Sequence, residues 1–142
     1  MSIRTISRAL PLGLTAVATA LVFVGPARAE GSWTSSFSGI RPGWDTRQWT
    51  DMNTDSVQTS LTIKSCYQNS GNLFTSLLWQ LTYKNTFTPD ENMGRHNIDC
   101  RSSSGATVNY GDVKRGNYVF GYVSANGSTS YYYSAPYVRV GY

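Results

Sequence analysis

Apolar residues recur at every second position in two central segments of the chain. The segment 57–63 places three of them on one face, namely Val57, Leu61 and Ile63. The segment 77–83 does the same with Leu77, Trp79, Leu81 and Tyr83. Side chains two residues apart point to the same side of a strand, so each segment is predicted to form a β-strand with one buried face.

The last third of the sequence predicts a meander of strands. A strand is expected over 117–124, followed by a tight turn at Asn126-Gly127, because this pair accepts the positive φ angles of a type I′ turn. A returning strand is expected over 129–134. Pro136 is then expected to break the sheet or lie at its edge, before a last strand over 137–142.

The N-terminal part is less regular. A strand over 33–39 would place Trp33 and Phe37 on one face, and Arg41-Pro42-Gly43 predicts a turn. The stretches 44–55 and 86–99 show no regular spacing of hydrophobic residues and are expected to be loops. No helix is predicted after residue 29, because Ser, Thr, Gly, Asn and Tyr dominate the composition. About seven short strands predict one all-β domain over 30–142, a small β-sandwich.

The first 29 residues have a different character. Arg4 and Arg8 precede an apolar stretch, and Ala27-Arg28-Ala29 follows it. This order is typical of a secretory signal peptide over 1–29, cleaved before Glu30. We therefore expect a secreted, extracellular protein without a membrane anchor.

Removal of the signal peptide changes the charge. The whole chain has 12 basic and 8 acidic residues, and three of the basic ones lie in the predicted signal peptide. The remaining part is nearly neutral and has no Lys/Arg run longer than Lys114-Arg115, which argues against nucleic-acid binding.

The chain has two cysteines, Cys66 and Cys100. An even number of cysteines in an exported chain predicts a disulfide, and two cysteines allow only one pairing. The bond would staple a domain that is small enough to profit from it.

Few residues are suited to catalysis or to metal binding. His96 is the only histidine, and its proximity to Asp99 does not define a catalytic triad, so no enzyme activity and no cofactor are expected. Asp51, Asn53 and Asp55 match the opening of a calcium loop. Ser56 stands where that loop needs glycine and Thr62 where it needs glutamate, so an Asx-rich turn is the simpler interpretation, and calcium binding stays open.

Aromatic residues are the larger clue. Rings that combine a rigid apolar area with a polar tip are typical of protein interfaces and of sugar-binding sites. The predicted partner-binding residues crowd into the N-terminal segment: Trp33, Phe37, Trp44 and Trp49. Tyr131, Tyr132 and Tyr133 would place rings on both faces of one strand. The N-terminal strand is also a candidate for exchange with the sheet of a partner.

This layout resembles the small adaptor, or spoke, subunit of the umbrella toxin particles that Streptomyces-type bacteria export. The likeness lies in the signal peptide, the cysteine pair, the segment from Trp33 to Trp49 and the tyrosine-rich C-terminal part. The resemblance implies a non-enzymatic role, in which the adaptor bridges a lectin-like subunit to a large toxin subunit in a particle that inhibits competing bacteria.

Our leading hypothesis is thus a secreted protein–protein adaptor in an antibacterial toxin complex. One alternative is a carbohydrate-binding module or lectin that uses the tyrosine strands. Another is an inhibitor of an extracellular hydrolase, in which the loop 86–99 enters an active site.

Overall fold

The computed structural model describes residues 31–68 and 76–142. The predicted signal peptide lies outside these residues. Within them the protein is all-β, with nine strands in two sheets. The first sheet contains β1 (Ser32–Ile40), β3 (Ser60–Lys64), β4 (Tyr67–Gln68), β7 (Ala106–Asn109) and β9 (Tyr133–Gly141). The second contains β2 (Trp49–Asp51), β5 (Leu77–Lys84), β6 (Glu91–Ile98) and β8 (Gly116–Ala125).

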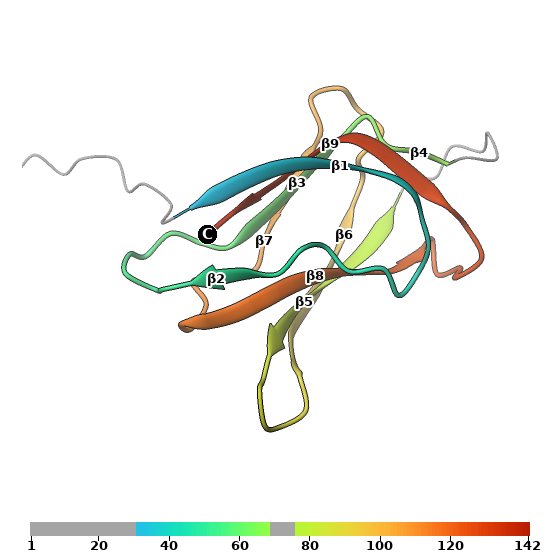
Figure 1. Ribbon diagram of the computed structural model, residues 1–142. Coiled ribbons are helices and arrows are strands. Elements are labelled where there is room, and N and C mark those ends of the chain that lie inside the picture. The colour runs from blue at the N-terminus through green and yellow to red at the C-terminus, as the bar shows by residue number, and fades with distance from the viewer. Residues whose placement is uncertain (1–30, 69–75) are drawn as a thin grey trace, which may run out of the picture.

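The two sheets stack as layers, which confirms the predicted β-sandwich (Figure 1). The strand order is β1-β9-β3-β7 in one sheet, with β4 also paired to β9, and β2-β8-β5-β6 in the other. All the pairs are antiparallel. Edge strands β6 and β7 approach each other on one side of the sandwich, while β1 and β2 lie at the other ends of their sheets.

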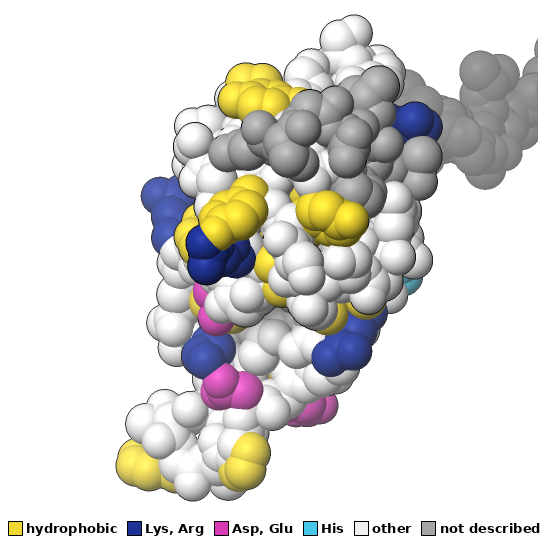
Figure 2. All heavy atoms as spheres, turned by 90° about the vertical axis from the view of Figure 1, so that its right-hand side faces the viewer, with side chains coloured by type: hydrophobic (Ala, Val, Ile, Leu, Met, Phe, Trp, Pro, Cys, Tyr) yellow, Lys and Arg dark blue, Asp and Glu magenta, His cyan; other side chains and the backbone are white. Residues whose placement is uncertain are grey.

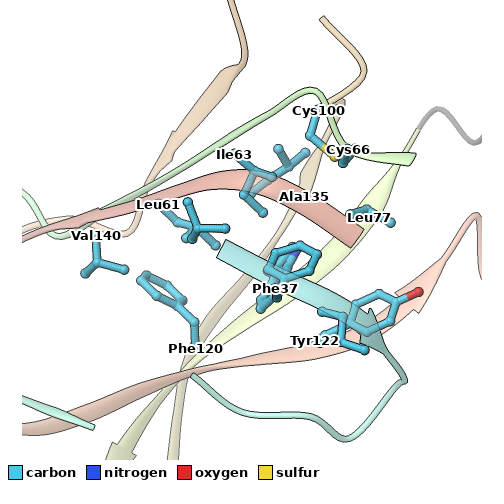
Figure 3. Packing of buried hydrophobic residues seen from close by; sticks show 14 of the residues in the cluster. Phe37, Leu61, Ile63, Cys66, Leu77, Cys100, Phe120, Tyr122, Ala135 and Val140 are labelled. Carbon is cyan, nitrogen blue, oxygen red and sulfur yellow. A yellow bond between two sulfur atoms is a disulfide. The ribbon is translucent and has the colours of Figure 1, made fainter. Parts of the chain in front are cut away.

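The core fills the space between the layers. The alternation in β3 and β5 is confirmed, because Leu61, Ile63 and Trp79 are completely buried. Phe120 of β8 is also buried, and Phe37 of β1 points into the same interior (Figure 3). Most of the apolar residues predicted to share a strand face therefore belong to one continuous core from both sheets. Val57 does not, because it precedes β3, and Tyr83 is only partly buried against this core.

The disulfide is confirmed. Cys66 follows β3, Cys100 follows β6, and their Cα atoms are 5.3 Å apart, within the usual range for a disulfide. The amide of Cys66 also donates to the carbonyl of Cys100 at 2.9 Å. The bond thus joins the two sheets at one end of the sandwich (Figure 3).

Two predicted loops contain strands. Residues 86–99 were expected to be irregular, but Glu91–Ile98 form β6, which pairs with β5. This edge strand is polar on both faces and buries only Ile98, so it lacks the alternation that marks a strand. Similarly, 44–55 includes β2, which pairs with β8 through only three residues.

The predicted C-terminal meander is only partly formed. Asn126 and Gly127 have φ angles of 45° and 78°, as the predicted type I′ turn requires. No strand spans 129–134, however: β9 begins at Tyr133 and joins the other sheet. The turn is therefore followed by a change of sheet.

Pro136 lies inside β9 and does not end it. Its position coincides with a bulge, since Ser35 pairs with Val138 while Phe37 pairs with Ala135. On the other side of β9, Pro136 faces the gap between β3 and β4. Proline lacks an amide donor, and a bulge is a place where a sheet tolerates it.

Candidate functional site

The edge of β1 is the longest exposed sheet edge in the described part of the chain. β1 has nine residues and pairs with β9 on one side, and no described strand pairs with its other side. Its sequence contains neither a charged residue nor a proline, the two features with which proteins commonly guard an edge. The opposite edge strand, β7, has only four residues and lies near β6. The edge strand of the other sheet, β6, has eight residues and contains Glu91 and Arg95. β1 is therefore the longest edge strand without a charged residue or a proline, although its pairing with β9 is irregular on both sides of Phe37.

The turn that follows β1 places an aromatic ring beside this edge. The Trp44 amide donates to the Arg41 carbonyl at 3.0 Å, and Gly43 has a φ angle of 90°. This geometry is that of a type II turn, with Pro42 and Gly43 at its two central positions, and it confirms the predicted turn. The Tyr122 amide then donates to the Trp44 carbonyl at 2.8 Å, which fixes the segment against β8.

A pocket of about 100 Å³ opens between β1 and this segment. It is lined by Trp33, Ser35, Ser36, Phe37, Trp44, Thr46, Arg47 and Val138. The Phe37 ring lies 5.9 Å from the Trp44 ring and 5.8 Å from the Trp79 ring, measured between centroids. The pocket wall is thus built on core residues and is rigid on the side of Phe37.

Three of the four predicted partner-binding residues line this pocket: Trp33, Phe37 and Trp44. The fourth, Trp49, lies behind it and contacts Trp33 with ring centroids 6.2 Å apart. Their exposure differs. Trp33, Phe37 and Trp49 are buried, whereas Trp44 is 37% exposed. Trp44 is therefore the most exposed member of the group, and the other three act mainly as core residues.

Arg47 supplies a positive charge at the pocket. Its guanidinium carbon lies 4.5 Å from the centroid of the Trp33 ring, a cation–π contact. Among the described residues, no carboxylate forms a salt bridge with Arg47. The Trp33 Nε1 atom is buried and has no hydrogen-bond acceptor among the described residues. Aromatic walls with one unneutralised cation suit an apolar group that carries a negative charge nearby.

The predicted strand that would carry Tyr131, Tyr132 and Tyr133 is not formed. Tyr133 begins β9 and is buried in the core, so the three successive rings do not share one strand. Tyr132 is 37% exposed, and the guanidinium carbon of Arg41 lies 4.0 Å from its ring centroid. The expected two-faced tyrosine strand is wrong, because the chain changes sheet at this point.

The candidate calcium residues hold backbone turns. Asp51 is buried, and its Oδ1 accepts the Asn53 amide at 2.8 Å, while Asp55 Oδ1 accepts the Val57 amide at 2.7 Å. The Asn53 side-chain amide donates to the Val113 carbonyl. Among the described residues, no group of three or more His, Cys, Asp or Glu side chains is assembled that could hold a metal ion. The Asx-turn interpretation accounts for these contacts.

His96 and Asp99 make separate contacts. His96 packs edge-to-face against Tyr110, with ring centroids 4.6 Å apart. The Asp99 carboxylate accepts two hydrogen bonds from the Arg101 guanidinium, at 2.8 and 2.9 Å, and this side-chain hydrogen bonding lowers the pKa of Asp99. The structure does not bring the two residues together as a hydrogen-bonded pair.

Comparisons of this chain with protein-family models, with curated proteins and with solved structures found no match. The structure also has no helix, across residues 31–68 and 76–142, that is long and apolar enough to cross a membrane. The features of the described residues that bear on function are the edge of β1, the pocket beside it and the rest of their surface.

Proposed function

We propose that this protein is a secreted, non-enzymatic adaptor that binds an extended segment of a partner protein along β1. A nine-residue edge strand without charged residues or proline, beside an aromatic pocket, is the observation that supports this proposal. An added strand gains affinity from main-chain hydrogen bonds and specificity from pockets that receive its side chains. An apolar side chain of the partner would occupy the pocket against Trp44, and an acidic neighbour would meet Arg47.

The buried disulfide is consistent with secretion, since such bonds persist in oxidising, extracellular surroundings. The resemblance to the spoke subunits of umbrella toxin particles supplies the biological setting that we propose. There the partners would be a lectin-like subunit and a large toxin subunit, and the assembly would act against competing bacteria.

Ser36→Lys and Trp44→Ala are each expected to reduce recovery of the partner at least about tenfold. A lysine in the middle of β1 disfavours strand addition, and loss of the Trp44 ring removes one wall of the pocket. The measurement is affinity purification from the culture supernatant of the native host through a C-terminal tag, with quantitative mass spectrometry of the co-eluting proteins.

Asn109→Lys is the matched control, because it places the same charge on the edge strand β7 at the other end of the sheet. This variant is expected to retain the partner fully. Thermal unfolding of all three variants separates loss of binding from loss of fold. Full retention of the partner by both test variants, or recovery of the wild-type protein alone, would contradict the proposed function.

Carbohydrate binding is the second candidate, and one observation favours it. Trp44 presents its ring beside Arg47 and Ser35 in the same pocket, a combination that also suits a sugar ring. A pull-down of the purified protein with insoluble polysaccharides separates the two candidates. Retention that needs no other protein and that is abolished by Trp44→Ala would favour sugar binding.

A further inference from the structure

The connection between β5 and β6 carries the most exposed large hydrophobic side chain in the described part of the protein. Phe87 is 97% exposed, whereas the next large hydrophobic residue, Tyr67, is 53% exposed. Figure 1 shows this connection projecting beyond the sheet of β5 and β8, on the side away from β1. In Figure 2 hydrophobic side chains occupy the projecting lower end of the molecule.

Interactions at the base of the hairpin hold its shape. Lys84 and Asp90 form a salt bridge across the base. The Asn85 amide donates to Asp90 Oδ1 at 3.2 Å, and the Asn85 side-chain amide donates to the Pro89 carbonyl at 2.9 Å. A side chain that is presented on an already ordered loop loses less conformational entropy on binding than one on a loose loop.

The charged residues at the base of the hairpin are paired. Asp90 is bound to Lys84, and Glu91, the first residue of β6, forms a salt bridge with Lys114 at 2.5 Å. The hairpin therefore offers neither the cluster of cations that attracts an anionic membrane nor a net charge that would steer a charged ligand. Its recognisable chemistry is a single phenyl ring between Thr86 and Thr88.

We propose that Phe87 is the anchor of a second protein interface, in which its ring enters an apolar pocket of a partner that admits one phenyl group. The inference rests on the proposed adaptor function and deepens it, because a bridging protein needs two separate surfaces. The edge of β1 would hold one partner and the tip of the hairpin the other. Aromatic anchors that fill a pocket commonly supply most of the binding energy of an interface.

The test compares Phe87→Ser with the wild-type protein and with Ser36→Lys, in the same affinity purification from the native host. The wild type is expected to recover two partners. Phe87→Ser should lose one of them by about 30-fold or more and retain the other, which Ser36→Lys should lose. Because the side chain is almost completely exposed, Phe87→Ser is expected to leave the thermal unfolding midpoint unchanged.

Three further variants sharpen the comparison. Thr86→Ser, at the neighbouring exposed position, is the control and should bind like the wild type. Phe87→Leu should restore part of the binding, since leucine also fills an apolar pocket. Asp90→Asn removes the charge that pairs with Lys84 but keeps Phe87, and should weaken binding by about three- to tenfold, because the loop is then less ordered before binding.

Retention of every partner by Phe87→Ser would overturn this inference and leave the proposed function intact when Ser36→Lys still loses its partner. The reverse pattern would overturn the role of β1 and support the hairpin. Recovery of the wild type alone would overturn both. Co-sedimentation of the wild type, but not of Phe87→Ser, with phosphatidylcholine vesicles would replace the protein partner with a membrane surface and so overturn the inference as well.

Discussion

Replacement of both Cys66 and Cys100 with alanine is expected to lower the free energy of unfolding by about 3–4 kcal/mol. The disulfide connects residues 34 positions apart and restricts the unfolded chain accordingly. It also ties the chain between β3 and β4 to the end of β6, so its loss removes a link between the sheets. For a domain of this size, the unfolding midpoint should fall by roughly 10–20 °C.

Thermal unfolding followed by circular dichroism, with and without a reductant, measures this effect. The wild type should shift toward the variant when it is reduced, while the variant itself should not respond to the reductant. Equal midpoints of the oxidised wild type and the variant would show that the disulfide does not stabilise the domain.

A steep loss of structure is expected between about pH 10 and pH 12. Burial raises the pKa of Tyr122 to about 12, and it also raises those of Tyr110, Tyr118 and Tyr133. Tyrosines in the unfolded chain ionise near pH 10. Because the pKa is higher in the folded state, the stabilisation by neutral tyrosine is complete below about pH 10 and is lost as the pH rises through 12. Each group then lowers the free energy of unfolding by at most about 1.4 kcal/mol per pH unit.

Absorbance at 295 nm reports ionised tyrosine, and far-ultraviolet circular dichroism reports the fold. The two signals should change together in one cooperative step. Tyr122→Phe is an informative variant, because its hydroxyl is buried without an acceptor among the described residues. The change should make the transition less steep without loss of stability at pH 7. A native circular dichroism spectrum at pH 12 would contradict this prediction.

Strands that bury one face were predictable from the sequence. The alternation in β3 and β5 identified Leu61, Ile63 and Trp79 as core residues, and the structure confirms them. β6 was missed because both of its faces are polar, so its pairing with β5 is not marked by a hydrophobic period. Likewise, Asn126-Gly127 predicts a local turn, but a turn contains no information about which sheet the next strand joins.

The candidate site shows a similar limit. The aromatic residues of the N-terminal segment were identified, and three of them line one pocket. Their burial was not predictable, because an apolar ring on a strand serves a core as well as it serves an interface. The contact between the segment around Trp44 and β8 depends on backbone hydrogen bonds, which no side-chain pattern reveals. The sequence did not single out Phe87 within the stretch 86–99, because one phenylalanine between two threonines forms no hydrophobic pattern.

The position of β9 determines when the fold can be completed. This last strand pairs with β1, β3 and β4, so it holds together the sheet in which it lies. Gly39 donates to Ser134 across a separation of 95 positions, a measure of how far apart in the sequence these contacts are. During synthesis, the first sheet therefore lacks its central strand until the C-terminal residues have left the ribosome. Because contacts between distant residues slow folding, we expect the chain to stay open for most of its synthesis, the condition in which a polypeptide can be threaded through a narrow channel.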